Sequence, residues 1–386
     1  MRIFIEPTEP LLFRRGRSFD AGESNFAESL FPPTPETLQG ATRAMIATHW
    51  DKNGTLAAAF KDPKLTALIG DREGYGCFRI TGLALGRRTE ENGLVERLFP
   101  TPVHLIQDDK NRLRLKPEVI DIEHVICNLP EDIGYLLKPE QSTEGKLKPL
   151  GGWLSEANLL LALTPKEENS LSQLDVIKNS DIFEYESRLG IGMSNATKTT
   201  QEGYLYQVQM VRMKPNYGFV VDIRLSASPA SSNVVAPANE TLLDDSTTQS
   251  MLRLPPTGWL TIGGEQRTAH FTVLQAKDKV SGDDIDQSKM GRLVYIAAPA
   301  YFSDGWRPSA DHFPKLSEPL TVAINRYEPI GGWKLKPGDA GGESKQTRRC
   351  VPAGSVYFFK ESAPITQPLT EYGWQIGYGI AYTGEY

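Results

Sequence analysis

Glycine and arginine occur together in four segments of this sequence, a combination that suits the binding of phosphate groups. In the first segment, Arg14, Arg15 and Arg17 surround Gly16. Arginine offers a planar pair of donors to phosphate oxygens, and glycine lets backbone N–H groups approach an anion closely. The other three segments contain Arg188, Gly190 and Lys198; Gly263, Gly264 and Arg267; and Gly331, Gly332, Arg348 and Arg349.

The surroundings of these segments would also suit a single-stranded nucleic acid. Residues 326–360 carry seven basic and three acidic side chains. Phe13, Phe19 and Trp333 lie nearby in the sequence, and aromatic rings can stack on unpaired bases. Composition alone favours a simpler interpretation, in which glycine marks turns and arginine covers solvated loops, and only the order of the segments along the chain strengthens the case for a ligand. With 42 Lys plus Arg against 48 Asp plus Glu, the net charge is −6, so any attraction for a polyanion must come from a local patch.

The sequence contains no recognisable catalytic, metal-binding or cofactor-binding arrangement. It lacks the glycine-rich loops that hold nucleotide phosphates and the G-x-S-x-G turn of serine hydrolases. Its five histidines and three cysteines are scattered, without the spacing of metal ligands. His49 ends a predicted helix, and no acid or base accompanies it, so a partly buried structural histidine is the better interpretation. We therefore predict no catalytic residue, no metal and no cofactor.

The elements that must position these segments are short, because 34 glycines and 27 prolines interrupt the chain. One helix is predicted from Thr34, as its cap, and Pro35 to about Trp50, and a second helix from Asp62 to Gly70. Strand-like runs surround them, namely Arg2–Ile5, Tyr75–Leu85, Tyr204–Met213, Phe219–Leu225, Trp259–Ile262, Phe271–Leu274, Leu293–Ala297, Leu320–Arg326 and Ser355–Phe359. This order predicts an α+β fold with antiparallel sheets.

The length of 386 residues predicts two domains, and we place their boundary near residue 200. Residues 226–250 are rich in small polar side chains, so we expect a surface insertion or a linker there, and we expect an exposed loop at residues 131–148.

No apolar run reaches membrane-spanning length, and the first residues lack the apolar core of a signal peptide. The cysteines form no disulfide framework, so we expect a cytoplasmic protein.

In the order of these four segments, the chain resembles the family of third subunits of the Cmr complex. The Cmr complex is the type III-B CRISPR effector, and the family belongs to the RAMP superfamily. The matching blocks are residues 9–22, 31–41, 188–191, 202–206, 263–267 and 351–359. The end of the chain, from Gly377 to Gly384, looks like the glycine-rich loop of the superfamily. Residues from about 90 to 180 and from 226 to 250 match poorly and are expected to be insertions.

The resemblance implies two ferredoxin-like domains of the RNA-recognition type, which we place at residues 1–200 and 201–386. It also implies a non-catalytic subunit that holds the repeat-derived 5′ handle of the crRNA. Its partners would be the large polymerase/cyclase-like subunit and the first backbone RAMP subunit. The residues that we expect to contact RNA are Arg14, Arg15, Gly16, Arg17, Arg188, Gly190, Lys198, Gly263, Gly264, Arg267, Arg348, Arg349, Gly377 and Gly379.

Two alternatives stay open. Some RAMP relatives cleave precursor crRNA with a histidine, and His270, which follows the Gly263–Arg267 segment, is the nuclease candidate worth testing. The second alternative belongs to a different class. It is a protein–protein scaffold whose arginines meet acidic partners instead of RNA.

Overall fold

The computed structural model describes residues 1–14, 26–50, 55–71, 74–91, 93–120, 133–143, 145–164, 168–193, 196–197, 199–230, 234–237, 240–275, 278, 290–335 and 342–386. These residues form mostly antiparallel sheets with short helices, which confirms the predicted mixture of helices and antiparallel strands. The helices are α1 (Pro35–Trp50), α2 (Leu56–Ala59), α3 (Pro63–Ile69), α4 (Glu156–Leu163), α5 (Asn179–Ile182) and α6 (Asp245–Leu252). Within the described ranges, none of them is long and apolar enough to cross a bilayer.

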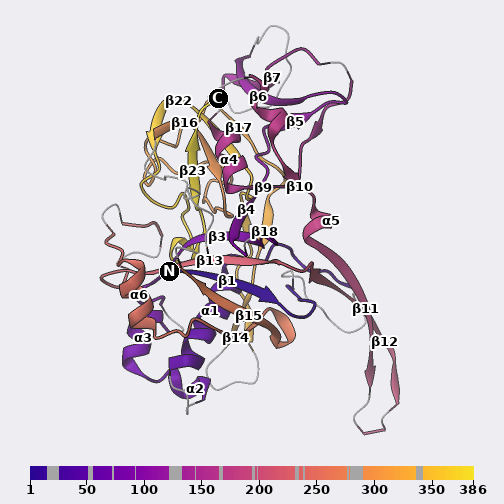
Figure 1. Ribbon diagram of the computed structural model, residues 1–386, viewed down its shortest axis with the longest axis vertical. Coiled ribbons are helices and arrows are strands. Elements are labelled where there is room, and N and C mark those ends of the chain that lie inside the picture. Colours follow the sequence, from indigo (N-terminus) through magenta and orange to yellow (C-terminus); the bar gives the residue numbers. More distant parts are fainter. Residues whose placement is uncertain are drawn as a thin grey trace.

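An eight-stranded antiparallel sheet lies at the centre of the molecule (Figure 1), in the order β10-β9-β4-β3-β13-β1-β15-β14. Its strands are β1 (Arg2–Pro7), β3 (Phe78–Arg88), β4 (Val95–Pro100), β9 (Trp153–Ser155), β10 (Val176–Ile177), β13 (Tyr217–Leu225), β14 (Thr257–Ile262) and β15 (Arg267–Leu274). Because β1 pairs with β13 on one side and with β15 on the other, the sheet joins segments from both sides of residue 200. The predicted boundary therefore falls between strands of one sheet.

Side chains of β1 alternate between two cores. Ile3 and Ile5 are fully buried on the side that α1 covers, in the same core as Leu38 of that helix. Phe4 points to the opposite face and packs in a smaller cluster with Val220 of β13. Successive residues of a strand point to opposite faces, so both faces of the sheet are covered at β1.

Both helices predicted near the start of the chain are confirmed, and so is Thr34 as the cap of the first one. At the start of α1, the Thr37 backbone N–H donates to Thr34 Oγ1 at 3.4 Å. At the start of α3, the Lys64 N–H donates to the Asp62 carboxylate at 2.8 Å, and the helix ends at Gly70, which has a φ of +78°. Such caps satisfy N–H groups that have no partner within the first turn, which is why polar residues at these positions predict helix starts.

A second, four-stranded sheet contains the C-terminal strands, orange to yellow in Figure 1. Its members are β16 (Met290–Ile296), β17 (Thr321–Ala323), β22 (Val356–Pro364) and β23 (Ala381–Gly384), in the order β17-β22-β16-β23. Numbered by position in the chain, this order is 2-3-1-4, and the strands β3-β13-β1-β15 of the central sheet have the same order. The Tyr295 hydroxyl of β16 donates to the Pro100 carbonyl of β4 at 2.7 Å and links the two sheets.

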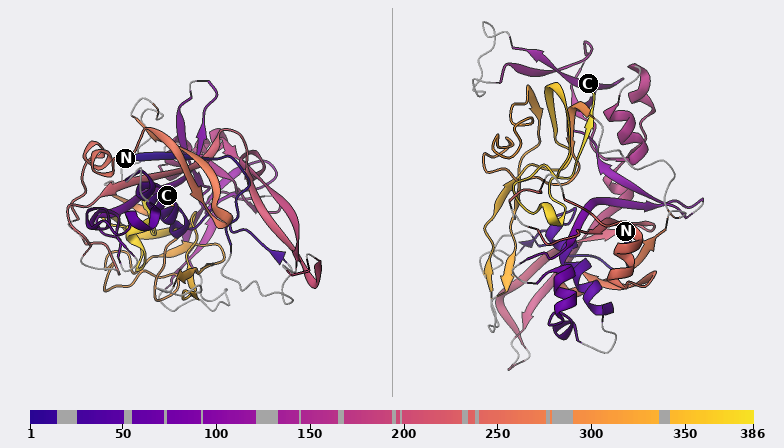
Figure 2. Two further views of the ribbon diagram at one scale, coloured as in Figure 1. Left: turned by 90° about the horizontal axis from the view of Figure 1, so that it is seen from below. Right: turned by 90° about the vertical axis from the view of Figure 1, so that its left-hand side faces the viewer.

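Further strands extend away from this centre (Figure 1, Figure 2). β11 (Phe183–Met193) and β12 (Thr200–Met213) form a long antiparallel hairpin, and β2 (Phe26–Ala27) pairs in parallel with β12. Another sheet has the order β7-β6-β5-β8, with β5 (Leu105–Gln107), β6 (Arg112–Val119), β7 (Tyr135–Pro139) and β8 (Lys148–Pro149). Two short pairs join β18 (Glu328–Ile330) to β21 (Arg348–Cys350) and β19 (Trp333–Leu335) to β20 (Gly342–Ser344).

The two segments that were set apart by their composition contain regular structure. Residues 131–148, predicted to be an exposed loop, include the strand β7, and residues 226–250, predicted to be a surface insertion or a linker, include most of α6. The Asp244 carboxylate caps α6 by accepting the Thr247 N–H at 2.8 Å, and Thr248 is fully buried. Small polar residues suit a linker, but they also cap and fill a short helix, so their composition alone did not reveal α6.

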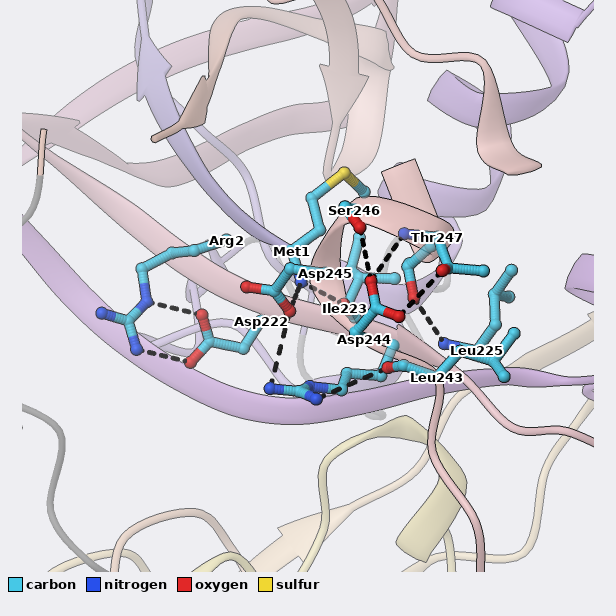
Figure 3. A network of polar contacts seen from close by, with 12 residues as sticks. Met1, Arg2, Asp222, Ile223, Leu225, Leu243, Asp244, Asp245, Ser246 and Thr247 are labelled. Atoms are coloured by element: carbon cyan, nitrogen blue, oxygen red, sulfur yellow. Dashed lines mark hydrogen bonds and ion pairs between the residues drawn. The ribbon is translucent and has the colours of Figure 1, made fainter. Parts of the chain in front are cut away.

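Charged side chains from β1, β13 and β4 meet in the central sheet, where β3 lies between β4 and β13. Figure 3 shows the Arg2–Asp222 pair of this group. Arg2 donates to the Asp222 carboxylate at 2.6 and 3.0 Å. Arg97 donates to the same carboxylate at 3.1 Å and to Glu156 of α4 at 2.8 Å. Burial alone would raise the pKa of Asp222, but the hydrogen bonds and charge of Arg2 and the charge of Arg97 hold this pKa below its ordinary value. The network ties three strands to α4.

Candidate nucleic-acid interface

The outer face of α1 separates two hollows, and these hollows bring together residues of three predicted segments. The N-terminal hollow has a volume of about 410 Å³ and is lined by α1, Arg14 and the Gly263–Gly264 turn. The Arg348 pocket has a volume of about 1350 Å³ and is lined by α1, Arg348 and the loop that contains Tyr372. Both hollows include the α1 residues Glu36, Gly40 and Ala44.

The sequence of α1 explains how one helix contributes to both hollows. Leu38 and Met45 fall on its buried face, while Glu36, Gly40 and Arg43 recur on the other side at helical spacing. A Cβ atom at Gly40 would have no heavy atom within 4 Å. The glycine therefore leaves bare backbone between the two hollows.

The loop before α1 and the β14–β15 turn pack directly on each other in the N-terminal hollow. The Gly264 N–H donates to the Leu12 carbonyl oxygen at 2.8 Å. Gly263 has a φ of +74°, and a Cβ there would lie 2.7 Å from the same oxygen, so glycine is required. Arg14 is exposed beside this contact, where its backbone forms a bridge with Ser29. The close backbone approach expected at Gly263 is thus made to the protein's own N-terminal loop.

Arg267 follows the same turn and is engaged by carboxylates. Its Nη1 donates to Glu9 at 3.0 Å, and its Nη2 donates to Glu265. The hydrogen bonds from Thr268 and Arg267 lower the pKa of the Glu9 carboxyl group. A phosphate would have to replace these carboxylates to reach the guanidinium. In this conformation Arg267 therefore fixes the turn.

Arg348 and Arg349 are neighbours in β21 and have different surroundings. The Arg348 guanidinium carbon lies 3.7 Å from the ring centroid of Tyr372 and lines the Arg348 pocket. The Arg349 guanidinium carbon lies 5.1 Å from the ring centroid of Tyr327, and Arg349 lines neither hollow. Because successive residues of a strand point to opposite faces, β21 separates two arginines that the sequence suggested as one group.

The carboxylate of Glu36 in the Arg348 pocket is held by neutral donors. It accepts a hydrogen bond from the Tyr372 hydroxyl at 3.3 Å and another from the Tyr378 hydroxyl. Burial, and then the charge of Glu36, raise the pKa of both tyrosines, so both remain protonated donors. Among the described residues, the Arg348 guanidinium contacts the Tyr372 and Tyr301 rings and the Gln346 carbonyl. The arginine therefore keeps a charge that is available to a ligand.

The glycine-rich loop at the end of the chain packs against the protein. Gly377 and Gly379 follow the 3-10 turn η4 (Trp374–Ile376), and their φ values are +96° and +67°. A Cβ at Gly377 would lie 2.7 Å from the Leu83 side chain of β3, and one at Gly379 would lie 2.6 Å from the backbone of Leu369. The close approach that these buried glycines permit is therefore to protein atoms, and it positions the loop that carries Tyr372.

Arg188 and Gly190 lie on the β11–β12 hairpin and line neither hollow. Arg188 forms an ion pair with Glu186 at 2.7 Å. A Cβ at Gly190 would clash with the ring of Tyr206 on the paired strand, so this aromatic ring covers the glycine. Four other expected residues lie outside the described ones, namely Arg15, Gly16, Arg17 and Lys198.

The sequence reasoning missed Gln39, Arg43 and Tyr372, which all line the Arg348 pocket. Gln39 and Arg43 are four residues apart on the predicted helix, so a search for polar side chains at helical spacing could have found them. Tyr372 gave no comparable signal, because only the folded chain brings it to Arg348.

Both histidines that were considered for catalysis have packing contacts. His49 Nδ1 lies 2.9 Å from the Met45 carbonyl oxygen, and its ring meets Phe271 edge-on at 5.5 Å between centroids. His270 meets Trp259 at 5.2 Å in the same manner. None of these contacts supplies an acid or a base. Over the part of the chain that the structure describes, no three His, Cys, Asp or Glu side chains converge as a metal site requires.

Known proteins resemble this chain over most of its length. A family model described as CRISPR-associated protein (Cas_Cmr3) matches residues 3–386. The CRISPR system CMR subunit Cmr3 of Saccharolobus solfataricus is 27% identical over 227 residues, which are 58% of this chain and 54% of that relative. The match thus spans about half the length of the curated relative.

Solved structures also resemble this chain. Two cryo-EM structures of type III-B Cmr-beta bound to cognate target RNA, one of them also with AMPPnP, each contain a similar chain. The two matches cover 93% of this chain and 86% of the solved one, at 20% and 19% identity and a TM-score of 0.48.

Proposed function

This chain belongs to the Cas_Cmr3 family of CRISPR-associated proteins, as the sequence resemblance predicted, and we propose that it is a non-catalytic, crRNA-binding subunit of a type III-B Cmr effector complex. In this proposal it holds the 5′ handle of the crRNA and docks onto the large polymerase/cyclase-like subunit and the first backbone RAMP subunit. The observation that carries the proposal is the convergence of Arg14, the Gly263–Gly264 turn and Arg348 around one face of α1.

The chemistry of the two hollows supports single-stranded RNA as the ligand. Arg348 lies on an aromatic ring, Arg14 is exposed, and Gly40 leaves bare backbone between them. Guanidinium groups bind phosphates, and aromatic rings stack on unpaired bases. Because the whole chain carries a charge of −6, we expect the isolated protein to bind RNA weakly and the complex to complete the groove.

The strand orders support the proposal of two ferredoxin-like domains. A ferredoxin-like domain follows the element order β-α-β-β-α-β. The elements β1, α1, β3, β13, α6 and β15 follow it, with strands β3-β13-β1-β15 adjacent in that order. The C-terminal sheet repeats the strand order. We therefore place the division between β15 and β16 instead of near residue 200, with β4 to β12 inserted in the first domain.

One observation favours the scaffold alternative as a second role. Leu189, Ile191 and Leu205 lie on one face of the β11–β12 hairpin and are 74%, 51% and 54% exposed. Grouped apolar side chains on a surface mark contact sites for other proteins. The hairpin would therefore dock onto an apolar surface of a neighbouring subunit. We also propose that the protein is cytoplasmic, because its cysteines suggest no disulfide framework and its sequence has no apolar run of membrane-spanning length.

Ultraviolet crosslinking of the assembled complex tests the proposed function. A labelled crRNA that co-purifies with the complex should crosslink to peptides from α1, from the Gly263–Gly264 turn or from the loop around Tyr372. The labelled RNA should remain uncleaved by this subunit. Crosslinks confined to other subunits would contradict RNA binding by this chain, and the scaffold role would then be the function that remains.

A further inference from the structure

Gln39 of α1 carries a buried hydrogen-bond donor without a partner among the described residues, and this donor indicates that the Arg348 pocket binds a ligand. The residue is 8% exposed and lines the pocket. Its Nε2 is buried and has no hydrogen-bond partner among the described residues. A buried donor without an acceptor is unfavourable and rare in folded proteins. We therefore expect a ligand to supply an acceptor at this place.

A second donor lies one helical turn further along α1. Arg43 Nη2 donates to the Asp71 carbonyl oxygen at 2.9 Å, whereas its Nε is buried and has no hydrogen-bond partner within the described ranges. Residues four apart lie on the same face of a helix, and both Gln39 and Arg43 line the pocket. Two neighbouring N–H donors suit the edge of a nucleobase that presents a carbonyl oxygen beside a ring nitrogen.

Arg348 and Tyr372 supply a flat surface in the same pocket. The guanidinium carbon lies 3.7 Å from the ring centroid, and the Tyr372 hydroxyl is fixed by its hydrogen bond to Glu36 at 3.3 Å. Unstacked bases are commonly held against aromatic rings and guanidinium planes. Donors and a flat surface are the two features by which proteins recognise a base outside a duplex.

The size and charge of the pocket distinguish between ligands. Its volume of about 1350 Å³ leaves room for a nucleotide together with the adjoining backbone of a longer chain. Its described charged residues comprise four cations and three carboxylates, namely Arg43, Lys61, Lys345, Arg348, Glu36, Asp71 and Glu371. This near balance suits a neutral base with its phosphate. A strongly acidic peptide would meet the carboxylates.

We propose that the Arg348 pocket holds one unstacked nucleotide of the crRNA, with its base against Arg348 and Tyr372 and its acceptor edge on Gln39 and Arg43. The inference rests on the proposed function, because the RNA has to be bound by the complex. Beyond the proposed function, the pocket recognises the base of one nucleotide. The neighbouring nucleotides pass over Gly40 towards the N-terminal hollow.

The test uses the assembled complex and crRNAs that carry 2-aminopurine at one handle position at a time, because stacking quenches the fluorescence of this base. In the wild-type complex, one position should be quenched. Tyr372→Leu and Arg348→Met should each restore the fluorescence at that position several-fold, and Tyr372→Phe, which keeps the ring, should not. Gln39→Leu should reduce the preference for the native base at that position in competition with the other bases.

Arg349 and Tyr327 provide a matched control, because they form a cation–π pair on the other side of β21. Arg349→Met and Tyr327→Leu should leave the quenching unchanged. A wild-type complex that retains crRNA without a quenched position overturns the inference but not the proposed function. Quenching that survives both Tyr372→Leu and Arg348→Met also overturns it, and so does displacement of the handle base by free AMP or UMP. A wild-type complex that retains no crRNA overturns both proposals.

Discussion

The guanidinium of Arg348 lies over the ring of Tyr372, with 3.7 Å between the guanidinium carbon and the ring centroid. An aromatic ring positions a cation without neutralising it, so Arg348 keeps its charge for a phosphate or a base. Arg267 differs in this respect, because its guanidinium donates to Glu9 and Glu265. Two arginines that look equivalent in the sequence therefore differ in how far their charge is already paired.

Charge reversal at Arg348 should weaken the retention of crRNA by the assembled complex. Arg348→Glu removes a phosphate contact and adds repulsion, so the slope of log affinity against log salt concentration should fall by about 0.7 or more. Arg349→Glu is the matched control, since Arg349 lies on the other side of β21 and lines neither hollow. Filter binding at several salt concentrations measures both. Equal losses would mean that only the total charge matters and that the pocket is not the site.

Charge reversal at Arg14 should have a similar effect at the N-terminal hollow. Arg14 is exposed there, beside the turn that contains Gly263 and Gly264, so Arg14→Glu should reduce crRNA retention and its dependence on salt. Lys315→Glu is the control, because Lys315 is exposed and lines neither hollow. Docking on the large subunit has to be measured in parallel, since its loss would mimic a loss of RNA. If both variants retain crRNA equally, the N-terminal hollow does not bind the handle.

Local features of the fold could be predicted from the sequence because they depend on neighbouring residues. Thr34 caps the helix that it was expected to cap, the second helix begins after Asp62 as expected, and the apolar run of β1 forms a strand with alternating buried sides. Capping and alternation are properties of a few consecutive residues. The glycine of the β14–β15 turn belongs to the same group, since the positive φ of Gly263 is a local requirement.

The pairing of distant segments could not be predicted in the same way. No run of residues near β1 indicates that β13 and β15 flank it, so the sequence does not show that strands from both sides of residue 200 share one sheet. The pairing of Arg267 with Glu9 and the stacking of Arg348 on Tyr372 also join residues that are far apart in the chain. These contacts decide which arginines are paired with carboxylates. For that reason the composition of the loops could suggest a kind of ligand, but it could not show how each arginine is held.

The two histidines should be dispensable for RNA cleavage by the complex. His49 is held by the Met45 carbonyl and the Phe271 ring, and His270 packs on Trp259, so neither has an acid–base partner among these contacts. His49→Ala and His270→Ala should leave crRNA maturation and target cleavage unchanged, as measured with labelled RNA. Loss of precursor cleavage by a folded His270→Ala complex would instead support the endoribonuclease alternative.

His104 should make the stability of the protein fall in mild acid. Burial, and then the charge of Arg114, lower the pKa of His104 from 6.5 to about 3. Because the folded pKa lies below the unfolded one, the unfolded state binds the proton first. The stabilisation is complete above the unfolded pKa of 6.5 and is lost towards pH 3, by up to about 1.4 kcal/mol per pH unit. His104→Leu should flatten this dependence in urea unfolding between about pH 7.5 and about pH 5. Equal slopes in both proteins would exclude His104 as the cause.

Asp222 should be among the residues on which the stability of the central sheet most depends. It accepts from Arg2 at 2.6 Å and from Arg97 at 3.1 Å, so Asp222→Asn leaves buried guanidinium groups without this counter-charge. Breaking a buried ion pair lowers the free energy of unfolding by about 3–5 kcal/mol. We expect the lower end of this range, because Arg97 keeps its bonds to Glu156.

The control for Asp222→Asn is Glu385→Gln, which breaks the exposed Arg292–Glu385 pair at 3.0 Å and should lower the free energy of unfolding by at most about 1 kcal/mol. Because the folded pKa of Asp222 is lowered, its contribution is present at neutral pH and is lost as the pH falls below the ordinary aspartate pKa of 3.8 towards the folded value. Urea unfolding should therefore separate Asp222→Asn from the wild type widely at neutral pH and less as the solution becomes acidic. If the two variants lose the same stability at neutral pH, the buried network contributes no more than an exposed ion pair.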